Sequence, residues 1–259
     1  MPELAPDDVT LHVEVDGEGS PTSVFAHGLT NSCRETARIT PFLPGTKVRF
    51  CFRGHGHSSS PETGYRFADF ARDLEAVADA YGADVGCGTS LGAGALCHLV
   101  AAKPDRFRKL VMLLPAGLDR PFELKERLLR TARMIDGKPM AEAVQALLDD
   151  PERRENYERF PFLREVDRDN LATLNPVGIP RAIRELVNDW PLEDREHMRA
   201  VTAPTLLISR RGDDIHPAIV GEILADIMPN AELMMFDDGD AMWQGLPQIL
   251  ARVSEFLLA

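Results

Sequence analysis

The sequence reads Gly88-Thr89-Ser90-Leu91-Gly92 at the point where one hydrophobic pattern gives way to another. Residues 81–87 are typical of a helix end followed by a short buried strand, and residues 93–102 are small and apolar at helical spacing. A serine on so tight a strand-to-helix turn projects its hydroxyl above the sheet, and the flanking glycines leave space where a Cβ would clash. The helix that follows begins with free N–H groups, so the stretch predicts a serine beside donors that can stabilise an oxyanion.

Strand and helix patterns alternate on both sides of this turn. We expect strands at Val9–Val15, Thr22–Ala26, Lys47–Phe52, Arg108–Leu114, Thr205–Ser209 and Ala231–Phe236, and helices at Phe67–Tyr81 and Gln244–Leu258. This alternation predicts an α/β fold with a mostly parallel, doubly wound sheet that helices cover on both faces.

Residues 118–199 interrupt the alternation. They hold helical patterns and several prolines but no convincing strand; the helical patterns are Leu124–Met134, Met140–Leu148 and Ile179–Val187. We therefore expect residues 1–117 and 200–259 to form the core, and residues 118–199 to form a helical lid inserted over the strand ends. A separate helical domain fits less well, because the sheet pattern resumes directly afterwards.

Composition limits the possible partners. Among 259 residues, 41 acidic side chains outnumber 29 basic ones, and a net charge of −12 argues against nucleic acid and anionic membranes. No apolar run is long enough to span a bilayer, and residues 1–4 do not open a signal peptide. The cysteines form no C-x-x-C pair, which indicates reduced thiols in a cytoplasmic protein; they are Cys33, Cys51, Cys87 and Cys97. We expect no metal site, and no cofactor signature is visible.

Four motifs in order resemble those of the α/β-hydrolase superfamily. They are an H-G-x loop at His27-Gly28-Leu29, an R-G-H-G-x-S turn at residues 53–58, the G-x-S-x-G turn at residues 88–92, and an acid loop at Ser209–Pro217. The resemblance covers most of the chain except residues 118–199. It implies an α/β-hydrolase fold that catalyses acyl transfer.

The resemblance also implies roles for particular residues. Ser90 corresponds to the nucleophile, and the backbone N–H groups of Leu29 and Leu91 correspond to the oxyanion hole. Asp213 corresponds to the acid of the triad, because it has the family's spacing to the following proline; the adjacent Asp214 competes for this role.

The histidine of the triad is missing from its usual place. Where the family has a histidine after the last strand, this chain has Gly239-Asp240, and no histidine follows His216. An aspartate with an ordinary pKa near 4 is a poor general base for a serine. Asp240 therefore does not simply replace the imidazole, and the triad looks incomplete or rearranged.

Another histidine could supply the base. His216 stands three residues after Asp213, at the correct rim of the sheet, and is the candidate surrogate; the alternative is a side chain that only stabilises its loop. We place His27 in the oxyanion loop, bordering the substrate site. The remaining histidines are assigned to loops, packing or the surface; they are His12, His55, His57, His98 and His197.

Aromatic side chains near these motifs favour an apolar or aromatic small-molecule substrate. Trp243 follows the vacant histidine position and either lines the pocket or anchors the last helix. Phe122, Tyr157, Phe160 and Phe162 fall in the expected lid and suggest an apolar ceiling.

Three functions remain open from the sequence. The first is hydrolysis of an ester or related acyl or carbonyl compound through Ser90. The second is a lyase or cyclase reaction in the same oxyanion pocket, and the third is binding without catalysis. A strained serine turn favours an enzyme, since mere binding does not need one.

Overall fold

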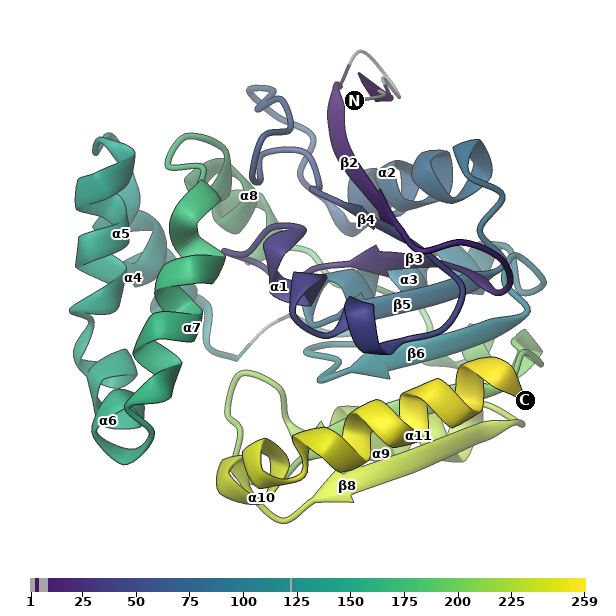
Figure 1. Ribbon diagram of the computed structural model, residues 1–259. Helices are drawn as coiled ribbons and strands as arrows, with labels where there is room; N and C mark the ends of the chain where they lie inside the picture. The colour runs from purple at the N-terminus through teal and green to yellow at the C-terminus, as the bar shows by residue number, and fades with distance from the viewer. Residues whose placement is uncertain (1–2, 5–8, 122) are drawn as a thin grey trace.

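A mostly parallel sheet forms the centre of the computed structural model, which describes residues 3–4, 9–121 and 123–259 (Figure 1). The strands lie in the order β1-β2-β4-β3-β5-β6-β7-β8. Their bounds are β1 Glu3–Leu4, β2 Leu11–Asp16, β3 Thr22–Ala26, β4 Thr46–Phe50, β5 Val85–Thr89, β6 Lys109–Leu113, β7 Thr205–Arg210 and β8 Ala231–Phe236. The pairs β1–β2 and β2–β4 are antiparallel, and every later pair is parallel. The predicted fold class is confirmed.

Helices cover both faces of the sheet. The helices of this layer are α1 Arg34–Ala37, α2 Phe67–Ala80, α3 Leu91–Ala102, α9 Ala218–Ile227, α10 Gly239–Gln244 and α11 Leu246–Leu258, with short 3-10 turns η2 Thr40–Phe42 and η4 Arg195–Ala200. In β3, Val24 and Ala26 join the cluster packed by α2, α3 and α9, whereas Phe25 joins the cluster packed by α11. This two-residue alternation buries each strand on both sides, as a parallel sheet requires.

Between β6 and β7 the chain forms a helical insertion. Its elements are α4 Lys125–Ile135, α5 Met140–Leu148, α6 Pro151–Arg159, α7 Phe162–Asn170, η3 Leu171–Thr173 and α8 Gly178–Leu186. These helices gather beyond one end of the sheet (Figure 1) and bury a hydrophobic cluster of their own. Leu29, just after β3, packs against both this cluster and the main core. The insertion therefore adjoins the edge of the sheet where the parallel strands end.

The expected elements differ from the observed ones mainly at their ends. Thr22–Ala26, Ala231–Phe236 and Met140–Leu148 are reproduced residue for residue. The closing helix expected from Gln244 begins two residues later as α11, after the short helix α10, which was not expected. Pro247 in the first turn of α11 has no N–H to continue the preceding helix. No helix in the described ranges is long and apolar enough to cross a membrane.

Candidate active site

Ser90 lies on a strained turn between β5 and α3. Its backbone has φ +50° and ψ −106°, in a region that residues with a side chain rarely adopt. A Cβ on Gly88 would lie 2.5 Å from the Gly92 carbonyl, and a Cβ on Gly92 would lie 2.2 Å from the Ala26 oxygen. Only glycine fits either position. The Ser90 N–H also donates to the Leu113 oxygen at 3.0 Å, so neighbouring strands hold the turn in place.

His216 lies beside Ser90 although 126 residues separate them in the chain. The Ser90 Oγ is 3.0 Å from His216 Nε2, and His216 Nδ1 is 3.0 Å from Asp213 Oδ2. An ionised carboxylate only accepts hydrogen bonds, so Nδ1 carries the proton and Nε2 can accept from the serine hydroxyl. The carboxylate, the imidazole and the hydroxyl are therefore joined by two consecutive hydrogen bonds.

Asp213 is a well-supported buried carboxylate, with a side chain 5% exposed. Its Oδ1 accepts the N–H groups of Ile215 and His216, each at 3.0 Å, and its Oδ2 accepts Arg210 Nε at 2.8 Å. Burial raises the pKa of Asp213, but the hydrogen bond from His216 and the charge of Arg210 outweigh burial and lower it overall. Asp213 thus stays ionised and orients the imidazole.

Asp240 lies in the first turn of α10 and forms an ion pair with Arg159 at the end of α6. A Cβ on the preceding Gly239 would lie only 2.0 Å from the Arg210 guanidinium, which covers this glycine. The structure thus places the imidazole of His216, rather than the Asp240 carboxylate, against Ser90. Of the two alternatives left open for His216, the structure favours the surrogate base, because the acid loop itself reaches the serine.

The backbone at Leu91 and at Gly28 lies next to the serine. Leu91 is the first residue of α3, where an N–H has no partner within its helix. The loop after β3 also passes close by, since a Cβ on Gly28 would lie 3.5 Å from the Ser90 Cβ. The Gly28 carbonyl accepts from Asn31 N at 3.2 Å, and in a trans peptide the N–H of Leu29 points the opposite way.

His27 orders this loop from the inside. Its ring is fully buried; Nδ1 donates to the Gly28 oxygen at 2.8 Å and Nε2 accepts the Phe52 N–H at 3.0 Å. Burial and the nearby His55 lower the pKa of His27 to about 3, which keeps the ring neutral. Both ring nitrogens are hydrogen-bonded to backbone groups. The sequence led us to expect His27 at the border of the substrate site, and the buried ring does not lie there.

The aromatic residues singled out in the sequence lie in two different places. Trp243 is 41% exposed, and its ring contacts Phe162 of α7 with centroids 6.1 Å apart; Phe160 in turn contacts Phe162. These rings join α10 to the helical insertion. Tyr157 instead lies buried in the insertion's own cluster, and Phe122 lies outside the described residues.

Two residues beside the site have no motif that singles them out. Arg210 ends β7 and donates to Asp213, and Glu35 of α1 accepts the Gly28 N–H at 2.7 Å. The position of Arg210 within the acid loop, three residues before Asp213, is a weak signal for its role. The remaining histidines lie elsewhere: His57 and His197 are exposed as expected, and His98 contacts the Pro191 carbonyl at 2.8 Å.

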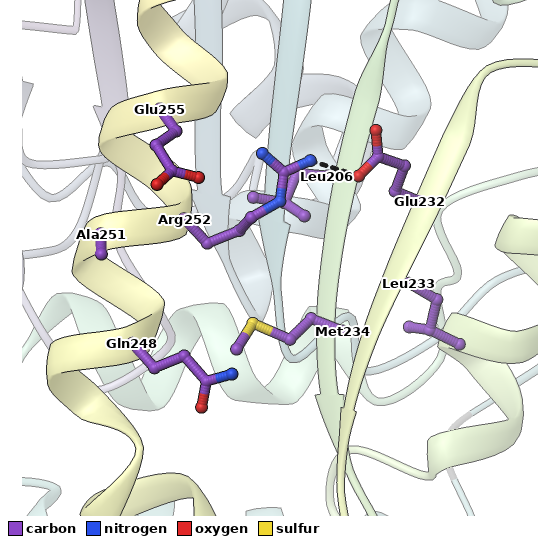
Figure 2. Close-up of a pocket in the computed structure, with 8 residues that line it drawn as sticks. All are labelled: Leu206, Glu232, Leu233, Met234, Gln248, Ala251, Arg252 and Glu255. Carbon is purple, nitrogen blue, oxygen red and sulfur yellow. Dashed lines mark hydrogen bonds and ion pairs between the residues drawn. The ribbon is translucent and has the colours of Figure 1, made fainter.

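A groove of about 410 Å³ lies between β8 and α11, apart from these residues (Figure 2). An ion pair between Arg252 and Glu232 crosses it. Its lining includes neither Ser90 nor any residue of the acid loop; the residues are Leu206, Glu232, Leu233, Met234, Gln248, Ala251, Arg252 and Glu255. The groove therefore has no part in the chemistry at Ser90.

Comparisons with known proteins identify the family of the chain. Residues 24–244 match the model of the alpha/beta hydrolase fold family. Over 112 residues the chain is 35% identical to 2-(acetamidomethylene)succinate hydrolase of Mesorhizobium japonicum, covering 40% of this chain and 39% of that protein. It is 24% identical to a putative carbamate hydrolase, RutD, of Azorhizobium caulinodans, covering 92% and 91% of the two chains.

Among solved structures, an enol-lactonase from Burkholderia xenovorans superposes with a TM-score of 0.82 at 22% identity and covers all of both chains. Because the family model spans most of the sequence, the chain belongs to the alpha/beta hydrolase fold family.

Proposed function

We propose that this protein is a serine hydrolase of small esters or related acyl compounds. The single observation that carries the proposal is the 3.0 Å contact between Ser90 Oγ and His216 Nε2, with Asp213 bonded to the other ring nitrogen. A serine hydroxyl needs such an imidazole to become an effective nucleophile. The names of the relatives, which include hydrolases and an enol-lactonase, support the same reaction class.

The geometry suits a two-step acyl transfer. Ser90 Oγ attacks the acyl carbon while its proton passes to His216 Nε2, and Asp213 stabilises the resulting imidazolium. The N–H groups of Leu29 and Leu91 stabilise the oxyanion, and the imidazolium then protonates the leaving oxygen. In the second step His216 takes a proton from water, which attacks the acyl carbon of the acyl-serine. The bond from that carbon to Ser90 Oγ then breaks, the imidazolium returns its proton to Oγ, and the acid is released.

Apolar side chains where the helical insertion meets the core favour an apolar or aromatic acyl group. Leu29 presents an apolar side chain between the core and the helical insertion. Phe162 and Trp243 remain 52% and 41% exposed where the insertion meets α10. Apolar surface of this kind binds an apolar portion of a substrate by removing it from water.

Turnover of p-nitrophenyl esters with short and aromatic acyl groups tests the proposal. The wild type is expected to release p-nitrophenol with saturable kinetics, and Ser90→Ala to lose activity by about 10³-fold or more. Ser90→Ala activity equal to that of the wild type would refute hydrolysis through Ser90. Wild-type protein that binds the esters but does not cleave them would favour the lyase, cyclase or binding alternatives.

A further inference from the structure

Glu35 lies directly behind the loop that follows β3. Its Oε2 accepts the Gly28 N–H at 2.7 Å, and its Oε1 accepts the side-chain amide of Asn31. A Cβ on Gly28 would lie 3.3 Å from Glu35 Oε1 and 3.5 Å from the Ser90 Cβ. The carboxyl group and the serine thus flank the same glycine.

Gly28 is held at both of its polar groups. Glu35 binds its N–H, while His27 Nδ1 and Asn31 N both donate to its carbonyl oxygen, at 2.8 and 3.2 Å. The carbonyl belongs to the same planar peptide as the Leu29 N–H. These bonds therefore fix the direction in which the Leu29 N–H points.

We propose that Glu35 is a positioning residue of the oxyanion hole, which acts through Gly28 and Asn31 to hold the Leu29 N–H in place. The inference rests on the proposed function, since an oxyanion develops only when Ser90 attacks an acyl carbon. A bond that matters only in the transition state affects kcat and leaves KM nearly unchanged. Loss of Glu35 should show this signature.

The environment of Glu35 allows a neutral group to replace the carboxylate. Burial, and to a smaller extent the charge of Asp167 on α7, raises the pKa of Glu35. The hydrogen bonds from Gly28 and Asn31 lower it, and the net pKa is about 7. A glutamine at position 35 keeps one acceptor for the Gly28 N–H. Its NH₂ can donate to Asn31 once that amide rotates to present its oxygen. Glutamine should therefore preserve the support that alanine removes.

The test measures p-nitrophenyl ester kinetics and the affinity for an arylboronic acid, which forms a tetrahedral adduct with an active serine. Wild type, Ser90→Ala, Glu35→Ala and Glu35→Gln are compared, with Glu75→Ala on α2 as a control. Glu35→Ala is expected to lower kcat by about 10- to 100-fold, less than the loss of a whole oxyanion donor, and to weaken boronate binding in parallel. KM should stay within about twofold, and Glu35→Gln and Glu75→Ala should stay within about threefold of wild-type kcat.

Unchanged kcat in folded Glu35→Ala would overturn the inference, and so would equal losses in Glu35→Ala and Glu35→Gln. If Glu35→Ala does not fold, Glu35→Asp replaces it, because the shorter carboxylate cannot reach both Gly28 and Asn31. Wild-type kcat in Glu35→Asp would then also overturn the inference. A separate outcome tests the proposed function: it fails if the wild type is no more active than Ser90→Ala.

Discussion

In the proposed mechanism, the acid and the base come from one short loop. Asp213 and His216 are three residues apart, and the Asp213 carboxylate accepts the backbone N–H of His216 as well as its ring Nδ1. Hydrogen bonds within the loop thus fix the orientation of the imidazole independently of its contact with Ser90. The segment after β8 is free for another contact, and there Asp240 pairs with Arg159 of the insertion.

The two aspartates should therefore behave differently when neutralised. Asp213→Asn is expected to lower kcat by about 10⁴-fold, because an amide does not hold the imidazole in its reactive tautomer. Asp240→Asn should keep kcat within about threefold, since an exposed ion pair contributes about 0–1 kcal/mol. Ester kinetics of the two variants check this, and a larger loss in Asp240→Asn would contradict it.

Glu35 should make stability depend on pH. Its pKa rises from 4.5 to about 7 on folding, so the unfolded chain releases the proton first and the folded state loses stability as pH increases through this window. Glutamine does not ionise, so Glu35→Gln removes this loss of stability at high pH. The Tm of Glu35→Gln relative to wild type is expected to be higher at pH 8 than at pH 5.5, by about 2–4 °C for each kcal/mol of difference. A Tm difference that is independent of pH would show that Glu35 titrates normally.

At the scale of elements, the junction of β5 and α3 depends on close backbone approach. Gly92 sits against the Ala26 carbonyl of β3, whereas Gly82 has φ +62° and open space around its Cβ position. Gly92→Ala should destabilise the fold by about 3 kcal/mol or more through overpacking. Gly82→Ala should cost only about 1 kcal/mol, from backbone strain alone. Urea unfolding measures both, and similar values would refute the packing argument.

At the scale of the whole molecule, the sheet and the helical insertion have different cores. β3, β5 and β6 are buried on both faces, while the insertion has its own smaller cluster and several exposed helix faces. Hydrogen exchange is therefore expected to be faster in α5 to α7 than in these strands, by about tenfold or more. Equal protection would show that both parts open only by global unfolding.

Much of this architecture could be predicted from the sequence, because local patterns encode it. The strands alternate or run apolar, and the glycines around Ser90 mark a turn that only they permit. The helix α6 was missed since it is almost entirely polar, and α7 was missed since it is short and its apolar side chains are few. Glu35 has no motif at all, because its role depends on where α1 packs.

The sequence could reduce the number of candidates for the general base but could not identify it. The spacing of His216 after Asp213 made it a candidate, yet a histidine that only stabilises its loop has the same spacing. The decisive quantity is the distance from His216 to Ser90, which depends on the pairing of β5 with β6 and of β6 with β7. For the same reason, the sequence could not show that Asp240 pairs with Arg159.

The most direct measurement of the central claim is the rate at which a fluorophosphonate labels Ser90, followed by mass spectrometry of the intact protein and of the Ser90 peptide. The wild type is expected to be labelled rapidly at Ser90, and His216→Ala about 10³-fold more slowly, because the hydroxyl has lost its proton acceptor. Equal labelling rates in folded wild type and His216→Ala would contradict the claim that His216 is the base for Ser90.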